Sequence, residues 1–290
     1  MQIKPVRVLI LGATGMLGST LLRFFASKKH IDIAGTIRSN QGKTFFTADL
    51  WNKLIPGIDV ENVESVNYAF ELFKPDIVIN CVGIVKQLNE SDDPLVAIPI
   101  NSLLPHQLAD LCTKQQARLI HFSTDCVFSG AKGLYLEGDF PDANDLYGRS
   151  KYLGEVAGKT NVLTLRTSII GHELSGAHSL VNWFLSQNDP IKGYSKAIFS
   201  GLPTVEIARI LDEFVFTNPS LNGVYHLSGF PINKFDLLTL IAKTYNKEIV
   251  INLDDKVKID RSLDSSRFRN STGFMPKKWP QLIQEMHQFL

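Results

Sequence analysis

Two residues four positions apart, Tyr147 and Lys151, could carry out acid catalysis in this chain of 290 residues. On a helix they would share one face, because side chains at positions i and i+4 lie one above the other. An ammonium group beside a phenol favours the phenolate and lowers the pKa of the phenol from about 10 toward neutral pH. The pair could therefore give a proton to a carbonyl group that is being reduced.

A strand that ends in hydroxyl groups lies upstream of this pair. Thr124 follows the apolar run Leu119 to Ser123, and Tyr147 begins the next helical pattern after an acidic loop. A Tyr-x-x-x-Lys pattern alone is weak evidence, because a chain with 7 tyrosines should contain one by chance roughly every other time. In this arrangement Thr124 would hydrogen-bond the substrate carbonyl, Tyr147 would protonate its oxygen, and Lys151 would hold a cofactor ribose. We predict that these three residues are catalytic.

A glycine-rich turn follows the first apolar run, Val6 to Leu11, and precedes a helical pattern. In such a turn, backbone N–H groups and the helix dipole can bind the diphosphate of a dinucleotide. The spacing is G-x-x-G-x-x-G rather than G-x-G-x-x-G, and a plain tight turn is the alternative interpretation. The residues predicted to bind the cofactor here are Gly12, Thr14, Gly15, Met16, Leu17 and Gly18.

The end of the second strand predicts which dinucleotide is bound. An acidic residue there would bind the ribose 2′-hydroxyl of NADH, whereas an arginine accommodates the 2′-phosphate of NADPH. The strand ends in Thr36-Ile37-Arg38-Ser39-Asn40, and Asp32 lies near its beginning, too far from the ribose. We therefore expect NADPH, with Arg38 at the phosphate. The alternative is that Arg38 is an ordinary solvated arginine.

Two further segments are expected to line the cofactor. Asp49 and Leu50, after the short run Thr44 to Thr47, would close the adenine pocket. The end of the strand Ile77 to Cys81 would lie along the cofactor, because open α/β sheets bind ligands at the carboxyl ends of their strands. We interpret Cys81 as a small buried filler rather than a redox group. The cofactor residues predicted in this second segment are Cys81, Val82 and Gly83.

The order of apolar and amphipathic patterns predicts an α/β fold, a doubly wound parallel sheet. Five strands are expected: Val6 to Leu11, Ile31 to Ile37, Ile77 to Cys81, Leu119 to Ser123, and Val162 to Arg166. Four helices alternate with them: Leu17 to Ser27, Val63 to Phe73, Leu103 to Lys114, and Tyr147 to Ala157. Later patterns predict helices Leu180 to Gln187, Val205 to Phe216 and Phe235 to Tyr245, and a strand Val224 to Leu227.

These patterns divide the chain near Arg166, where the alternation loosens into loops. We expect residues 1–166 to form the dinucleotide-binding domain. Residues 167–290 would be a smaller, mainly substrate-binding region, part of which returns to the first domain. No internal repeat or linker marks the boundary.

Composition excludes several function classes. A net charge of +1 without runs of one sign argues against nucleic-acid binding and for a small-molecule partner. No uncharged apolar stretch approaches the ~18 residues of a membrane span. The 3 cysteines are dispersed without disulfide or metal-ligand spacing, which favours a reducing cytoplasm and no metal.

The central block of the sequence resembles the extended short-chain dehydrogenase/reductase family, in particular its dTDP-4-dehydrorhamnose reductase branch. The similar residues are Ser123-Thr-Asp-Cys-Val-Phe-Ser-Gly130, Tyr135-x-Glu137-x-Asp139-x-Pro141, Tyr147-Gly-Arg-Ser-Lys151-x-x-Gly154-Glu155, Leu165-Arg-Thr-Ser-Ile169, Leu202-Pro-Thr204 and Gly223-Val-Tyr-His-Leu-Ser228. The resemblance implies a Rossmann domain, NAD(P)H, a Thr-Tyr-Lys triad and reduction of a 4-keto nucleotide sugar for cell-surface polysaccharide. It also places four residues at the substrate: Asp125, Cys126, Val127 and Ile169.

Two positions depart from that branch. Cys126 stands where the rhamnose enzymes have tyrosine, and Ile169 stands where they have tryptophan. A different deoxysugar, on dTDP or UDP, is therefore open. We interpret Cys126 as a small substrate-facing residue rather than a nucleophile, because the triad already supplies the acid.

Related activities stay open as alternatives. The 4,6-dehydratases of this fold follow the threonine with an Asp-Glu pair, whereas this chain has Asp125-Cys126. An epimerase needs little beyond a retained cofactor and a keto intermediate that can rotate. The regulatory subunit of methionine adenosyltransferase belongs to the same branch and binds a dinucleotide as part of a complex, so a regulatory or scaffold protein is the alternative from another class. The expected partners are a nucleotide-sugar substrate and, as an assembly to be tested, a second copy in a homodimer. No nucleic acid or membrane partner is expected.

Overall fold

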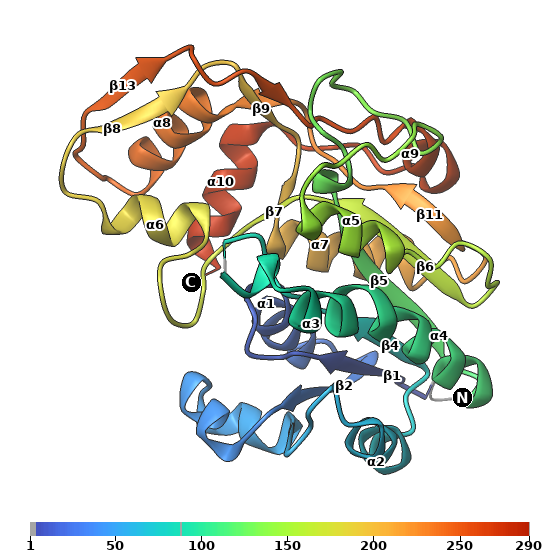
Figure 1. Ribbon diagram of the computed structural model, residues 1–290. Helices are drawn as coiled ribbons and strands as arrows, with labels where there is room; N and C mark the ends of the chain where they lie inside the picture. Colours follow the sequence, from blue (N-terminus) through green and yellow to red (C-terminus); the bar gives the residue numbers. More distant parts are fainter. Residues whose placement is uncertain (1–3, 88, 290) are drawn as a thin grey trace. The chain divides into compact units, whose positions relative to one another are not determined.

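Seven strands form one sheet in the order β11-β6-β5-β4-β1-β2-β3 (Figure 1). The computed structural model describes residues 4–87 and 89–289. Four of the pairings join β1 to β2, β1 to β4, β2 to β3 and β4 to β5, and all four are parallel. The order runs outward in both directions from β1, which confirms the doubly wound Rossmann fold. The strands are β1 (Val6–Leu11), β2 (Ile31–Ile37), β3 (Leu54–Pro56), β4 (Ile77–Asn80), β5 (Arg118–Thr124), β6 (Val162–Thr167) and β11 (Gly223–His226).

Helices cover both faces of this sheet. Side chains of a strand alternate between the two faces. Leu9 of β1 packs in a core with Phe70 of α2 and Leu108 of α4. On the other face, a Cβ added at Gly35 of β2 would meet Leu22 of α1 at 3.4 Å. The helices are α1 (Met16–Ala26), α2 (Val63–Phe73), α3 (Pro94–Ala97), α4 (Leu104–Lys114) and α5 (Leu146–Leu153).

Most of the expected elements occur within a few residues of their expected bounds, and one helix is shorter than expected. The helix expected from Tyr147 to Ala157 ends at Leu153. A Cβ at Gly154 would lie 2.0 Å from the carbonyl oxygen of Asn101, so the chain leaves the helix at a close backbone approach. β3, which follows Asp49 and Leu50, was not among the strands that the sequence patterns predicted.

The chain packs as two compact units. The first contains the chain through Ser123, with Asp145–Thr164 and Asn222–Val224. The second contains Thr124–Asn144, Leu165–Leu221 and Tyr225–Leu290. Residues 124–144 thus pack with the second unit although they precede Arg166 in the sequence. The functional assignment of residues 1–166 and 167–290 stays a prediction.

Small sheets and helices build the second unit. β9 (Ala197–Phe199) lies between β12 (Ile232–Asn233) and β14 (Ile259–Asp260), while β8 (Ile191–Tyr194) pairs with β13 (Ile251–Asp254) and β7 (Ile169–Ile170) with β10 (Leu202–Pro203). The helices are α6 (Leu180–Ser186), α7 (Thr204–Ile210), α8 (Lys234–Thr244), α9 (Ser266–Thr272) and α10 (Trp279–Gln288). α8 packs against α10 and α7 continues as the π-helical segment Leu211–Val215. No helix in residues 4–87 and 89–289 is long and apolar enough to span a membrane.

Candidate active site

The glycine turn after β1 has the geometry of a phosphate-binding loop. Gly12 has φ = 83°, a left-handed conformation that favours glycine. Its N–H donates to Thr36 Oγ1 at 3.1 Å, and the Gly15 N–H donates to the Gly12 carbonyl at 3.1 Å. A Cβ at Gly18 would lie 2.1 Å from the same carbonyl oxygen, so only glycine lets α1 approach the turn this closely.

The first turn of α1 is suited to an anion. α1 begins after Gly15, no side chain among the described residues caps it, and its first turn holds no acidic residue. The N–H groups at a helix N-terminus lack partners within the helix and attract negative charge. Thr14 and Gly15 are exposed at this point. These features fit the diphosphate of a dinucleotide.

The residues predicted to select and hold the adenosine half lie around the same turn. Arg38 is exposed directly after β2, whereas Asp32, near the start of β2, pairs with Lys53 at 3.4 Å. A Cβ at Gly42 would lie 3.2 Å from Thr14 Cγ2, so the segment that follows Arg38 packs on the glycine turn. Asp49 is exposed, and Leu50 is buried in the 3₁₀ helix Ala48–Lys53.

Tyr147 and Lys151 lie on α5, as the spacing predicts. Asp145 caps this helix by accepting the Gly148 N–H at 2.7 Å. Lys151 is buried, and its ammonium donates to the carbonyl oxygen of Phe122 on β5 at 2.7 Å. Burial lowers the pKa of Lys151 from 10.5 to about 8, and the nearby charge of Glu155 opposes that shift.

The loop after β4 reaches Lys151. A Cβ at Gly83 would lie 3.8 Å from the Lys151 ammonium, so the structure brings this part of the predicted cofactor segment next to the Tyr-Lys helix. Val82 N–H donates to the Asn80 side chain at 3.0 Å, which holds the start of the loop. Burial raises the pKa of the Cys81 thiol, so it stays protonated at neutral pH and fits the interpretation as a filler.

Asn101 is a positioning residue that the sequence patterns did not indicate. Its side-chain oxygen accepts the Ile84 N–H at 2.9 Å, and its amide nitrogen donates to the Ile84 carbonyl at 3.1 Å. The same nitrogen donates to Ser150 Oγ on α5 at 3.3 Å. Asn101 therefore joins the loop after β4 to α5. It lies in the π-helical segment Ile98–Leu103, and the only signal in the sequence was a polar residue inside an apolar run.

His121 lies in β5, and its buried imidazole is neutral. Its Nδ1 is 3.2 Å from the Asn80 amide nitrogen. Burial, followed by the charges of Lys151 and His106, lowers the pKa of His121 well below its usual value. Because the imidazole of His121 is neutral, it does not repel the positive charge of Lys151.

The predicted substrate residues belong to the second unit. Thr124 ends β5, where its hydroxyl oxygen accepts the Cys126 N–H and donates to the buried Asp125 carboxylate, both at 3.1 Å. Burial raises the pKa of Asp125, and the charges of Arg261 and Lys234 oppose this. Cys126 and Ile169 are partly exposed, whereas Val127 packs in a small core with Phe128, Tyr135 and Leu263.

A rigid loop follows Thr124–Val127. The rings of Phe128 and Tyr135 stack with centroids 4.1 Å apart. The Tyr135 hydroxyl accepts the N–H groups of Gly130 and Lys132, each at 3.1 Å. Glu137, further along the loop, accepts the His226 N–H at 2.9 Å. These contacts fix the backbone on which the predicted substrate residues lie.

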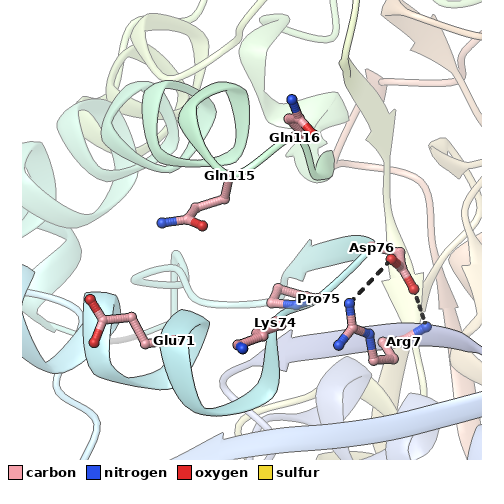
Figure 2. Close-up of a pocket in the computed structure, with 7 residues that line it drawn as sticks. All are labelled: Arg7, Glu71, Lys74, Pro75, Asp76, Gln115 and Gln116. Atoms are coloured by element: carbon pink, nitrogen blue, oxygen red, sulfur yellow. Dashed lines mark hydrogen bonds and ion pairs between the residues drawn. The ribbon is translucent and has the colours of Figure 1, made fainter.

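A polar hollow of about 400 Å³ lies at the opposite edge of the first unit's sheet (Figure 2). It is formed where β1 and β4 begin, and Arg7 pairs there with Asp76 at 3.6 Å. Doubly wound sheets bind ligands at the carboxyl ends of their strands. The hollow is therefore separate from the glycine turn and from Lys151.

Side chains that could bind a metal are dispersed in the part of the chain that the structure describes. No group of three or more His, Cys, Asp or Glu side chains there could hold a metal ion. Cys81, Cys112 and Cys126 are free thiols.

The parallel sheet, the glycine turn and the Tyr-Lys helix define a dinucleotide-binding α/β protein of the Rossmann class. The chain belongs to the RmlD substrate binding domain family, whose model matches residues 6–288. This result confirms the resemblance to the extended reductase family that the sequence motifs indicated.

Individual relatives agree with this assignment. A probable low-salt glycan biosynthesis reductase, Agl14 of Haloferax volcanii, is 33% identical over 165 residues, which are 56% of this chain and 52% of that protein. The matched segment thus spans about half the length of that relative. Methionine adenosyltransferase 2 subunit beta of Mus musculus is 25% identical over 84% of this chain and 74% of its own length. A crystal structure of dTDP-4-dehydrorhamnose reductase from Bacillus anthracis in complex with NADP has a TM-score of 0.80 and 21% identity over 100% of both chains, which shows the shared fold.

Proposed function

We propose that this protein uses NADPH to reduce the 4-keto group of a nucleotide-linked deoxysugar, in the synthesis of activated sugars for cell-surface polysaccharide. The observation that carries the proposal is the buried Lys151 ammonium, which lies on the same helix as Tyr147 and next to Gly83. The glycine turn of the same unit supplies a site for the cofactor diphosphate. Family membership and the named reductases among the relatives support the same activity.

Tyr147 is the proton donor in this proposal. NADPH, when bound, supplies hydride to the keto carbon, and the sugar oxygen gains negative charge as it is reduced. Tyr147 gives that oxygen its proton, while Thr124 donates a hydrogen bond to it. To do so, the Thr124 hydroxyl must turn away from Asp125, to which it donates at 3.1 Å in the structure.

Lys151 has two tasks. In this proposal its ammonium stabilises the phenolate that Tyr147 becomes when it gives up its proton, and it binds the ribose hydroxyls of the cofactor. The hydrogen bond to the Phe122 carbonyl leaves two of its three N–H donors for these tasks. A pKa of about 8 means that most molecules carry the charge at pH 7.

Arg38 would bind the 2′-phosphate of NADPH. Arg38 is exposed, and the segment that follows it packs on Thr14. The acidic residue of β2, Asp32, already forms an ion pair with Lys53. The solved relative from Bacillus anthracis is in complex with NADP, which supports this choice. The predicted adenine contacts of Asp49 and Leu50 belong to the same proposal.

The sugar is defined only by class. Cys126 and Ile169 replace two aromatic residues of the rhamnose enzymes and are both partly exposed. Their smaller side chains leave room for a substituent that an aromatic ring would exclude. We propose a deoxysugar on dTDP or UDP that differs from 4-dehydrorhamnose near the ring.

The test is a panel of enzymatically prepared dTDP-, UDP- and GDP-linked 4-keto sugars, with NADPH oxidation followed by absorbance. We expect oxidation with at least one dTDP or UDP substrate, and a product with a new hydroxyl at C4. Tyr147→Phe serves as the matched control, because it keeps the ring and removes the acid. Absence of turnover across the panel, with NADPH binding intact, would reject the reductase.

A regulatory role is the second candidate, because methionine adenosyltransferase 2 subunit beta matches over most of this chain. That role predicts dinucleotide binding without oxidation in the same assay. An epimerase would instead interconvert nucleotide sugars with no net NADPH consumption.

A cytoplasmic location and a homodimer complete the proposal. The three free thiols support the cytoplasmic location. Size-exclusion chromatography with light scattering tests whether the protein is a homodimer.

A further inference from the structure

The loop after β4 is attached to α5 at two points, which lie on either side of Tyr147 in the chain. At the first point, the Lys86 ammonium donates to Asp145 Oδ2 at 2.6 Å. The other oxygen of the same carboxylate, Asp145 Oδ1, accepts the Gly148 N–H at 2.7 Å and so caps α5. One carboxylate therefore joins the loop to the first turn of the helix that carries Tyr147.

The second attachment runs through Asn101. Its side chain binds both the N–H and the carbonyl of Ile84, and it also donates to Ser150 Oγ at 3.3 Å. Ser150 Oγ in turn donates to the Tyr147 carbonyl at 3.0 Å. All of these residues belong to the first compact unit. The turn that contains Tyr147 is thus held to the same loop from both of its ends.

The two attachments differ in burial. Asn101 and Ser150 are buried, whereas the side chains of Lys86 and Asp145 are 42% and 34% exposed. An ion pair as exposed as this contributes little to the stability of a fold. It does restrict the first turn of α5, because the carboxylate that it holds is the one that binds the helix N–H. The effect of Lys86 should therefore be on the orientation of that turn rather than on stability.

We propose that Lys86 is a positioning residue for Tyr147. The assignment rests on the proposed function, in which Tyr147 gives a proton to the oxygen of the sugar. A Cβ at Gly83 would lie 3.8 Å from the Lys151 ammonium, so the loop held by Lys86 is also the one next to Lys151. Proton transfer requires that donor and acceptor stay within hydrogen-bond distance. Loosening the first turn of α5 would therefore slow the chemical step while the acid itself remains.

The experiment is a double-mutant cycle on single-turnover reduction of the 4-keto sugar. Lys86→Met should lower the rate by about 5- to 50-fold, because a small misplacement of a reacting group is costly, while the affinities for NADPH and sugar change little. Lys86→Arg should restore most of the rate by keeping the ion pair. Asp145→Asn keeps an oxygen that can cap the helix but removes the charge, so it should slow the reaction equally. The double variant should be no slower than either single variant.

Lys159→Met is the matched control. It removes another exposed ion pair of the same unit, between Lys159 and Asp110, and should leave the rate unchanged. Thermal unfolding reports whether each variant is folded, and Lys86→Gln replaces Lys86→Met if the latter fails to fold. Amide hydrogen exchange of the free protein supplies a measurement that does not depend on turnover. Exchange at Gly148 should be faster in Lys86→Met than in the parent, and unchanged in Lys159→Met.

Several results would overturn the assignment. A parent-like rate or parent-like exchange at Gly148 in folded Lys86→Met would do so. Additive losses in the double variant, no rescue by Lys86→Arg, or an equal loss in Lys159→Met would do so as well. If the parent reduces no 4-keto sugar, the proposed function fails, and the exchange at Gly148 still shows whether Lys86 holds the first turn of α5. If the parent reduces the sugar and Lys86→Met is indistinguishable from it, the role of Lys86 alone fails.

Discussion

The ammonium of Lys151 donates a hydrogen bond to the carbonyl oxygen of Phe122, 2.7 Å away, and both residues are buried. This contact joins the helix of Tyr147 to the strand that ends at Thr124. It fixes the charge of Lys151 on the face of α5 that Tyr147 shares.

Tyr147→Phe should lower turnover by about 10²- to 10⁴-fold, the range for loss of a positioned general acid. NADPH affinity should change little, because the ring, its packing and the glycine turn are kept. Single-turnover reduction of the keto sugar and a fluorescence titration of NADPH measure the two quantities separately. A variant that reduces the sugar at the parent rate would show that the proton comes from another group.

NADPH affinity should fall as pH rises through about 8, because Lys151 loses its proton there. The direction follows from burial, which lowers the pKa of the ammonium in the folded protein, so the charged form that binds the ribose is the low-pH form. Lys151→Met should bind NADPH weakly at every pH between 6.5 and 9.5, roughly the range in which this titration occurs. A pH dependence of affinity that persists in Lys151→Met would assign the titration to a different residue.

Arg38→Ala should reduce the preference for NADPH over NADH. The substitution removes a charge-assisted contact with the 2′-phosphate, which contributes about 1.5–3 kcal/mol. The measurement is kcat/KM for both cofactors in the parent and in the variant. Lys29→Ala, at an exposed position shortly after α1, is the control and should leave the ratio unchanged. Equal efficiency with NADPH and NADH in the parent would contradict the assignment of Arg38.

Cys126→Ala should retain most of the turnover, because Tyr147 supplies the proton and no covalent intermediate is required. The Michaelis constant for the sugar can change, since Cys126 is partly exposed next to Thr124. Steady-state kinetics with saturating NADPH test this. If a folded variant with normal NADPH binding lost the chemical step entirely, Cys126 would be a participant in the reaction.

Short-range patterns in the sequence were sufficient for much of the fold. Continuous apolar runs predicted β1 and β2, and amphipathic spacing predicted α2 at its observed bounds, Val63–Phe73. The glycine spacing likewise predicted a turn that a Cβ at Gly18 would block. These features depend on residues close together in the chain, where steric and hydrophobic preferences act locally.

Contacts between distant residues were decided only by the tertiary structure. Just after α5, the Asn101 carbonyl approaches Gly154 so closely that a Cβ would lie 2.0 Å from it, and no local pattern near Gly154 encodes that approach. The role of Asn101 and the pairing of Lys151 with Phe122 arise in the same way. Burial and Coulomb interactions depend on three-dimensional distance, so the charge state of these groups is a property of the folded chain.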